Sequence, residues 1–387
     1  MNLADIQSAL RERNFDGWLF YDHHHRDPIA YRVLGLRDDL FVTRRWFYLI
    51  PAQGEPQKLS HRIEPAHLDP LPGSKQLYSG WQELQEKLRV ILGPYKTIAM
   101  QYSPNNFVPY IGLVDAGTVE LVRSFGKTVV TSGDLVGRFE AAWTEEQIAS
   151  HFFARDAIDK ITAAAFQEIG RRVRNGGTNE YEIQKWILEA FAREGLGIAE
   201  APNVSVNANS SDPHYEVRAD RAARIKEGDF VLLDIWGKKN APGSVYYDIT
   251  WTGVVGTPSA EQLKVFDIVK GARDVGIKTV QQAVSAGRKL AGWEVDNAVR
   301  EFITHAGYGD KFVHRTGHSI GTDVHGNGAN MDGLETKDER EVQPNTCFSI
   351  EPGIYMPSFG VRSEVNVLVR NGSAEVTGKI QQELVRI

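Results

Sequence analysis

Four carboxylates lie inside or directly beside stretches of the chain that otherwise have the composition of buried strands. Asp234 and Asp248 form a first pair in successive apolar runs, and Glu351 and Glu364 form a second pair in the same arrangement. An isolated ionised carboxylate in an apolar interior carries a large free-energy cost unless a cation or a metal ion neutralises it. Each pair fits the two strands of one hairpin, so each hairpin offers two carboxylates to one region.

A metal centre resolves the conflict between these charges. Four crowded carboxylates raise one another's pKa, whereas two divalent cations supply the four positive charges that neutralise them. His318, within the glycine-flanked segment 316–321, can add a nitrogen ligand. Such an oxygen-rich site favours manganese, cobalt, iron or zinc in a catalytic role over a structural zinc. Two ions about 3.5 to 4 Å apart can hold a bridging hydroxide and polarise a carbonyl, as amide hydrolysis requires.

Two other interpretations of these residues are weaker. A single carboxylate in an apolar run is as often an ion-pair partner or an edge-strand charge as a ligand, but four with a histidine favour metal. The segment 317–321 also satisfies the G-x-S-x-G pattern of a serine nucleophile, which needs a histidine after its acid. Only His325 follows Ser319, so the order excludes a serine hydrolase. His314 is interpreted as structural, because the glycines beside His318 disfavour a helical zinc pair.

The elements that must position the candidate ligands appear twice in the same order after Trp143. A capping box of Thr144 and Gln147 predicts the start of a long helix, and apolar periodicity predicts another after Gly177. Two successive helix-helix-strand-strand units indicate a duplicated α+β fold whose halves face each other across a sheet, with a cleft between them. The other predicted elements are strands 230–235 and 246–255, helices beginning near Ser259 and Trp293, and strands 346–351 and 361–369.

Residues 1–142 are predicted to form a smaller, mixed α/β domain. An amphipathic helix contains Ile6 and Leu10, and short strands fit the ranges 17–21, 46–50, 97–100 and 119–122. The change of pattern near Trp143 places the boundary between this domain and a domain of residues 143–387.

Composition excludes several classes of protein. With 42% apolar and 24% charged residues in 387, the chain is an ordinary globular protein. We expect no membrane segment, because no run approaches about 18 apolar residues, and no secretory leader. The single cysteine, Cys347, indicates a reducing compartment and a cytoplasmic address. A net charge of −6 and scattered basic residues argue against binding to nucleic acid.

The region 143–387 resembles the pita-bread metallopeptidases, and within them the Xaa-Pro dipeptidases (prolidases) and Xaa-Pro aminopeptidases. Residues 1–142 match the non-catalytic N-terminal domain of those enzymes only in size and pattern. The resemblance rests on five motifs in the family's order, which are Leu233-Asp234-Ile235-Trp236-Gly237, Tyr247-Asp248-Ile249-Thr250, Thr316-Gly317-His318-Ser319-Ile320-Gly321, Ile350-Glu351-Pro352-Gly353-Ile354-Tyr355 and Val361-Arg362-Ser363-Glu364.

The resemblance implies a role for each site residue. Asp234 would chelate one of two divalent ions, with manganese expected and cobalt, zinc or iron as alternatives. His318 and Glu351 would bind the other ion, and Asp248 and Glu364 would bridge both. The remaining roles are those of Glu351 as proton carrier, His214 and His325 as contacts to the substrate carbonyl or the tetrahedral intermediate, and Arg362 as a partner of an acidic ligand or of the substrate's C-terminal carboxylate.

Three positions depart from the family's pattern. Val245 replaces a usual tyrosine, Trp251 a usual arginine and Gly326 a commonly acidic residue. The tyrosine hydroxyl would normally help to hold the metal shell or the intermediate. These departures therefore concern the substrate class more than metal binding.

The resemblance implies a cytoplasmic enzyme that hydrolyses the Xaa-Pro bond of short proline-containing peptides, preferably dipeptides. An Xaa-Pro aminopeptidase, a hydrolase or lyase of a small non-peptide metabolite, and a non-enzymatic binding module are the alternatives; the intact ligand positions argue against the last. Relatives imply a homodimer in which the N-terminal domain of one chain borders the site of the other. The run His23, His24 and His25 is interpreted as a solvated loop.

Overall fold

The computed structural model describes residues 2–387, and the chain forms two compact units, one ending at Glu140 and the other spanning Ala141–Ile387. Each unit contains its own clusters of buried apolar side chains. In the described range, no helix is both long enough and apolar enough to span a membrane.

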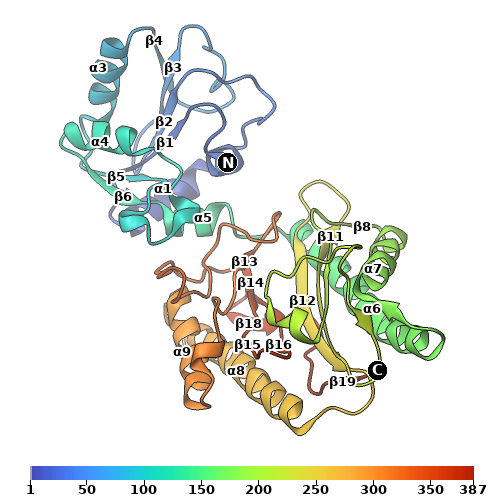
Figure 1. Cartoon of the computed structure of the whole chain (residues 1–387). Coiled ribbons are helices and arrows are strands. Elements are labelled where there is room, and N and C mark those ends of the chain that lie inside the picture. Colours follow the sequence, from blue (N-terminus) through green and yellow to red (C-terminus); the bar gives the residue numbers. More distant parts are fainter. Residues whose placement is uncertain (1) are drawn as a thin grey trace. The chain divides into compact units, whose positions relative to one another are not determined.

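The N-terminal unit is built on a six-stranded mixed sheet with strand order β4-β3-β2-β1-β5-β6 (Figure 1). Alternate residues of β1 enter different apolar clusters, Trp18 and Phe20 one, Leu19 and Tyr21 the other. Both faces of the sheet are covered, which explains the uninterrupted apolar run of this strand. The strands are β1 (Gly17–Asp22), β2 (Trp46–Pro51), β3 (Gln57–His61), β4 (Ser74–Tyr78), β5 (Thr97–Met100) and β6 (Thr128–Thr131), and the helices are α1 (Leu3–Glu12), α2 (Pro28–Leu34), α3 (Trp81–Leu92), α4 (Ala116–Ser124) and α5 (Gly133–Phe139).

The prediction of a strand at 119–122 was wrong, because this segment lies in α4. Asp115 caps the helix by accepting a hydrogen bond from the Thr118 N–H at 2.9 Å. Val119 and Val122 are buried on one side of the helix. The cap and the helical spacing of the apolar residues outweigh the preference of valine for strands.

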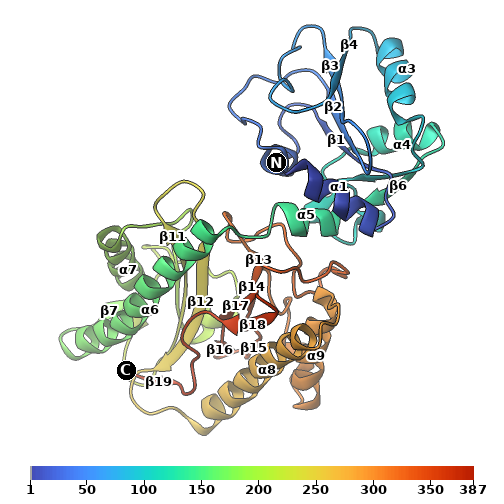
Figure 2. The same cartoon turned by 180° about the vertical axis from the view of Figure 1, so that it is seen from behind.

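The first half of the second unit packs two helices against a pair of long strands. Helix α6 begins at the predicted capping box of Thr144 and Gln147, and both of its hydrogen bonds are present. Helices α6 and α7 lie against the sheet that contains β11 and β12 (Figure 2). The elements are α6 (Glu145–Arg174), α7 (Glu180–Glu194), β8 (Leu196–Gly197), β9 (Asn203–Val206), the short helix η3 (Asn207–Ser211), β11 (Phe230–Lys239) and β12 (Tyr246–Val254), with β19 (Val385–Arg386) beside β12.

The second half repeats the order, which confirms the α+β fold with duplicated helix-helix-strand-strand units. Helix α8 begins at the predicted cap Ser259, where Gln262 completes the capping box. The predicted strand 361–369 is interrupted at Ser363 and Glu364, so that β16 pairs with β15 and β17 pairs with β14. The elements are α8 (Ala260–Ser285), α9 (Gly292–His305), β13 (Ser319–Ile320), β14 (Cys347–Ile350), β15 (Gly353–Tyr355), β16 (Gly360–Arg362), β17 (Val365–Arg370) and β18 (Ser373–Val376).

A fully buried histidine makes the second unit sensitive to acid. The ring nitrogens of His151 lie 2.7 Å from the Tyr246 carbonyl oxygen and 2.8 Å from the Thr377 hydroxyl oxygen. Burial lowers the pKa of His151 to about 4, below the value of about 6.5 that histidine has in an unfolded chain. Between these two values the folded state therefore binds fewer protons than the unfolded chain. The stability that His151 contributes is fully present above a pH of about 6.5 and is lost as the pH falls toward about 4.

We expect this group to lower the free energy of unfolding by about 1 kcal/mol between pH 7 and pH 5.5. Urea denaturation at both pH values, for the unmodified protein and for His151→Gln, measures the effect. The variant should lack this part of the pH dependence, because glutamine does not titrate. An unchanged pH dependence in His151→Gln would contradict the prediction.

Candidate metal centre

The first two candidate ligands share one face of the paired strands β11 and β12. In their register, Asp234 lies opposite Thr250, and Asp248 lies opposite Trp236. Directly opposed residues of an antiparallel pair point to the same face, as do residues two apart on one strand. Asp234, Asp248 and Thr250 therefore point the same way.

The second pair of acids lies where the ladder of β14 and β17 ends. Glu351 and Glu364 directly follow and precede the last paired residues, Ile350 and Val365. The Glu364 N–H donates to the Thr250 carbonyl oxygen at 3.2 Å, which joins this end of the ladder to β12. The four carboxylates are thus supplied by both halves of the unit.

Asn366 connects the same two strands with its side chain. Its Oδ1 accepts a hydrogen bond from the Asp248 N–H at 3.0 Å, and its Nδ2 donates to the Asp248 carbonyl oxygen at 2.6 Å. The side-chain amide of Asn366 thus gives β12 the two hydrogen bonds that the backbone of a neighbouring strand would otherwise give it.

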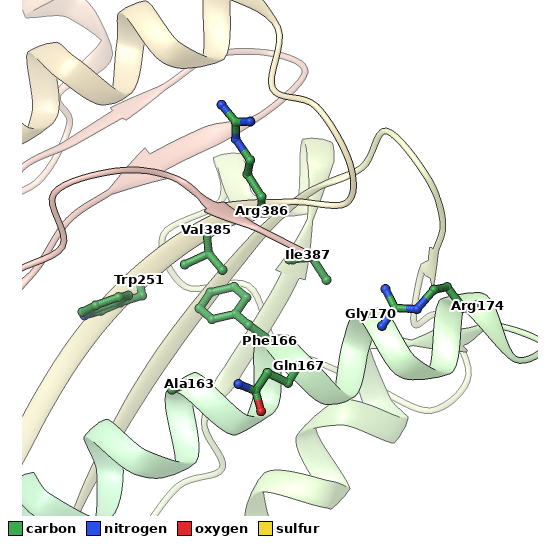
Figure 3. A pocket seen from close by; sticks show the side chains of 9 residues that line it. All are labelled: Ala163, Phe166, Gln167, Gly170, Arg174, Trp251, Val385, Arg386 and Ile387. Atoms are coloured by element: carbon green, nitrogen blue, oxygen red, sulfur yellow. The ribbon is translucent and has the colours of Figure 1, made fainter.

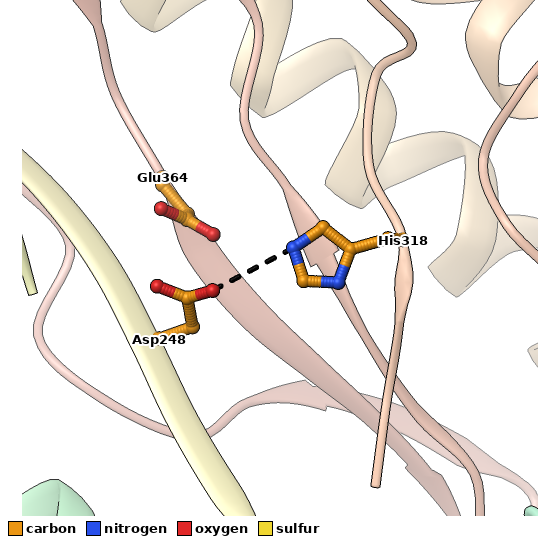
Figure 4. Close-up of side chains that lie close together, drawn as sticks. All are labelled: Asp248, His318 and Glu364. Carbon is orange, nitrogen blue, oxygen red and sulfur yellow. Dashed lines mark ion pairs between the residues drawn. The ribbon is translucent and has the colours of Figure 1, made fainter. Parts of the chain in front are cut away.

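The structure brings the five predicted ligands into one region. Asp248, His318 and Glu364 each offer one ligand atom, and these atoms lie within 4.8 Å of one another (Figure 4). His318 Nε2 is 3.5 Å from Asp248 Oδ2 and 3.4 Å from Glu351 Oε1. The Thr250 hydroxyl lies 2.8 Å from Glu364 Oε2 and 3.1 Å from Asp234 Oδ1.

Two carboxylate oxygens of this region fit a cation site. Asp248 Oδ1 and Glu364 Oε1 are buried and have no hydrogen-bond donor among residues 2–387. Buried acceptors are nearly always satisfied, so each oxygen calls for a proton, a water or a metal ion. The nearby oxygen donors and single imidazole match a hard divalent ion such as manganese.

Burial is the largest cause of the raised pKa of three of the acids. It raises the pKa of Asp234 to about 7. It also raises the pKa of Asp248, and it raises the pKa of Glu364 well above its ordinary value. Neighbouring carboxylates act in the same direction on all three groups. A bound cation would reverse this balance by favouring the ionised forms.

Glu351 and His318 shift each other's pKa in opposite directions. Burial by itself raises the pKa of Glu351, but His318 and Arg362 outweigh it and the pKa is lowered. Burial by itself lowers the pKa of His318, but Asp248 and Glu351 outweigh it and the pKa is raised.

Arg362 is buried among the acids and contacts Asp234. Its Nη2 forms an ion pair with Asp234 Oδ2, and its Nε donates to the Thr250 hydroxyl at 2.9 Å. The Tyr355 hydroxyl lies 3.4 Å from Arg362 Nη1 and 2.7 Å from Nε2 of His314. These contacts favour the expectation that Arg362 orients an acidic ligand over the expectation that it faces the substrate's carboxylate.

The two histidines predicted to contact substrate lie differently. The His325 ring stands edge-on to the His318 ring at 4.3 Å between centroids. His325 is exposed as a residue, but the surrounding protein partly buries its ring. This burial is the main cause that lowers the pKa of His325 to about 3, and the neighbouring His318 is the second. His214 is exposed, and its backbone N–H donates to Asp212 at 3.0 Å.

The three departures from the family's pattern have local explanations. Val245 is fully buried in an apolar cluster with Trp143. Trp251 packs toward Phe166 of α6 and lines a surface cavity of about 490 Å³ (Figure 3), and as an odd-numbered residue of β12 it points away from the carboxylate face. A Cβ on Gly326 would lie 3.0 Å from the Ser319 hydroxyl oxygen, so a larger residue is disfavoured there.

Ser319 has a structural role in this geometry. It is buried on β13, and its hydroxyl accepts a hydrogen bond from the Gly328 N–H at 3.0 Å. This contact agrees with the exclusion of a serine nucleophile.

Sequence reasoning missed three residues of the site. Thr250, Tyr355 and Asn366 contact ligands or their partners but are not predicted as site residues. Thr250 and Asn366 offered a signal, because each follows an acidic ligand by two residues within a predicted strand. Tyr355 offered no comparable signal.

Comparison with known proteins supports this description. The model of metallopeptidase family M24 matches residues 156–371. The Xaa-Pro dipeptidase of Pyrococcus furiosus is 29% identical over 253 residues, covering 65% of this chain and 67% of that enzyme. The crystal structure of dipeptidase PepE from Mycobacterium ulcerans covers 100% of this chain and 96% of its own, with a TM-score of 0.71 and 25% identity. That of a dipeptidase from Pyrococcus horikoshii covers 100% of both chains, with a TM-score of 0.64 and 26% identity.

Proposed function

The chain belongs to metallopeptidase family M24, and from this membership we propose that it hydrolyses the Xaa-Pro bond of dipeptides and other short proline-containing peptides. The convergence of Asp248, His318 and Glu364 within 4.8 Å carries the proposal. The similarity to the Pyrococcus furiosus Xaa-Pro dipeptidase supports the substrate class.

The five clustered residues would hold two divalent ions. Asp234 would chelate one ion, His318 and Glu351 the other, and Asp248 and Glu364 would bridge the pair. Manganese is the proposed ion, with cobalt, zinc or iron as alternatives. When bound, the pair supplies Lewis-acid polarisation of the scissile carbonyl and an activated water.

Glu351 is the proposed proton carrier. Its Oε1 accepts a hydrogen bond from the Ser349 hydroxyl at 3.0 Å, which orients the carboxylate. Because His318 and Arg362 lower the pKa of Glu351, its carboxylate is ionised and can accept a proton from the attacking water. The same oxygen would then deliver the proton to the departing proline nitrogen.

The histidines His325 and His214 would hold the carbonyl oxygen of the residue before proline as negative charge develops on it. Arg362 would keep Asp234 oriented through their ion pair. Proline suits such a site because its amide nitrogen carries no hydrogen, so binding its ring leaves no buried donor unsatisfied.

A panel of three peptides tests the proposal. Metal-stripped protein is supplied with manganese, cobalt or zinc, and hydrolysis of Ala-Pro, Ala-Pro-Ala and Ala-Ala is followed by amine release. We expect Ala-Pro to be cleaved fastest, Ala-Ala at a rate lower by at least about tenfold, and no cleavage before metal is added.

Each other result has a definite meaning. Faster cleavage of Ala-Pro-Ala would assign the chain to the Xaa-Pro aminopeptidases. Hydrolysis that persists in protein shown to be metal-free by mass spectrometry would overturn the metal-dependent mechanism. With metal bound and none of the three peptides cleaved, a non-peptide substrate would replace the proposed one.

We also propose, on the resemblance alone, that the enzyme is a homodimer and acts in the cytoplasm.

A further inference from the structure

The carboxylate of Glu180, the first residue of α7, accepts four hydrogen bonds although it has no exposed surface. Its Oε1 accepts from the Val206 N–H and from Asn209 Nδ2, both at 2.9 Å. Its Oε2 accepts from the Tyr215 hydroxyl and from the Ala223 N–H, both at 2.8 Å. A carboxylate is suited to this position because it offers four acceptor sites and no donor.

The four donors delimit the segment that carries His214. We name residues 207–223 the His214 loop; apart from η3 it contains no helix or strand. Val206 directly precedes this loop and Ala223 is its last residue, whereas Asn209 and Tyr215 lie within it. One buried carboxylate therefore fixes both ends and the middle of an otherwise irregular, largely exposed segment.

Two serines of the His214 loop contact the hairpin that carries Arg362. The Ser210 hydroxyl accepts a hydrogen bond from the Gly360 N–H at 2.8 Å, and the Ser211 hydroxyl donates to the Met356 carbonyl oxygen. A Cβ on Gly360 would lie 2.0 Å from the Ser210 carbonyl oxygen, so the close approach requires glycine. The loop is thus held by Glu180 and also by the hairpin that carries Arg362.

We propose that Glu180 is a positioning residue that fixes the His214 loop so that His214 faces substrate bound at the metal centre. The inference rests on the proposed function in one respect, since it takes His214 to contact the substrate. The anchoring of the loop by Glu180 stands on the hydrogen bonds alone.

Glu180→Gln is the variant that tests the role. Each carboxylate oxygen accepts from one backbone N–H, so either orientation of the amide places its NH₂ group against a backbone donor. We expect kcat/KM for Ala-Pro to fall by about 10- to 100-fold, because the loop is displaced from its productive position. Bound metal, measured by mass spectrometry, should not change. Glu182→Gln is the matched control, since it removes the same charge from the first turn of α7 at an exposed position outside the loop.

A double-variant cycle separates positioning from a general structural effect. If Glu180 acts through His214, adding Glu180→Gln to His214→Ala should lower kcat/KM by less than about twofold. A full additional loss in the His214→Ala background would overturn the positioning role. If Glu180→Gln does not fold, Tyr215→Phe replaces it in the same cycle, because it removes one of the four bonds and leaves the carboxylate.

Limited trypsin digestion tests the anchoring without any reference to activity. Arg218 and Arg221 are exposed within the His214 loop, and Arg288 serves as an exposed reference site outside it. We expect cleavage at the two loop arginines to become several-fold faster in Glu180→Gln and Tyr215→Phe, relative to Arg288. Unchanged loop cleavage would overturn the anchoring even in an active enzyme, whereas faster cleavage in a protein that hydrolyses no peptide would support the anchoring and count against the proposed function.

Discussion

Replacing Glu364 by glutamine is expected to lower kcat/KM for Ala-Pro by about 1,000-fold or more and to remove most of the bound metal. Glu364 Oε1 is buried and has no donor in the described part of the chain, and Oε2 lies 2.8 Å from the Thr250 hydroxyl. Glutamine keeps the size of the side chain but offers one oxygen and no charge, so it cannot bridge two cations. The stated factor corresponds to the loss of several kcal/mol of transition-state stabilisation, which bound metal ions supply by neutralising the developing charge.

The same substitution should not weaken the metal-free fold. Burial and the neighbouring carboxylates already raise the pKa of Glu364 well above its usual value, so the ionised form is unfavourable without a cation. Thermal unfolding of metal-free Glu364→Gln should therefore occur at the same temperature as in the unmodified protein or at a higher one. Glu375→Gln, on the exposed side of β18, is the matched control. Retained metal together with full activity in Glu364→Gln would refute the proposed ligand.

Replacing Arg362 by methionine is expected to lower the free energy of unfolding of the metal-free protein by about 3 kcal/mol or more. Arg362 is 4% exposed and forms an ion pair with Asp234. Its removal leaves the Asp234 carboxylate buried near Asp248 and Glu351, whose charges already oppose its ionisation. Breaking a buried pair costs more than the pair contributes, because Asp234 must then either carry an uncompensated charge or stay protonated in the folded state.

The destabilisation should depend on pH in a defined direction. With Arg362 present, the pKa of Asp234 is about 7, and without it the pKa rises further, so the acid stays protonated when folded. An acid with a raised pKa in the folded state destabilises the fold increasingly as the pH rises. The difference between Arg362→Met and the unmodified protein should thus be larger at pH 8.5 than at pH 6 in urea denaturation. Arg362→Lys, which keeps the charge, should show a smaller difference, and a defect that was equal at both pH values would contradict this account.

The sequence predicted those parts of the fold that depend on local pattern. The capping boxes at Thr144 and Ser259 are visible within four residues and are confirmed. The duplicated order of helices and strands follows from apolar periodicity and is confirmed as well. The prediction of a strand at 119–122 was wrong because four residues with two valines do not distinguish a strand from one helical turn.

The candidate ligands could be predicted because acids in apolar runs are rare and because five motifs occur in one order. The residues that support them could not, since their roles depend on register between distant segments. Asn366 reaches the backbone of Asp248, and Glu180 reaches that of Ala223. Nothing in the spacing of one chain shows which strand or loop will lie opposite another, and only the folded arrangement shows it.

The amide of Asn366 has a consequence for the rigidity of the metal centre. Its two hydrogen bonds to the Asp248 backbone join one half of the unit to the other. The Glu364 N–H joins them again at the Thr250 carbonyl oxygen. The spacing between Asp248 and Glu364 is therefore set by the backbone itself, so these ligands should need little rearrangement when ions enter or leave.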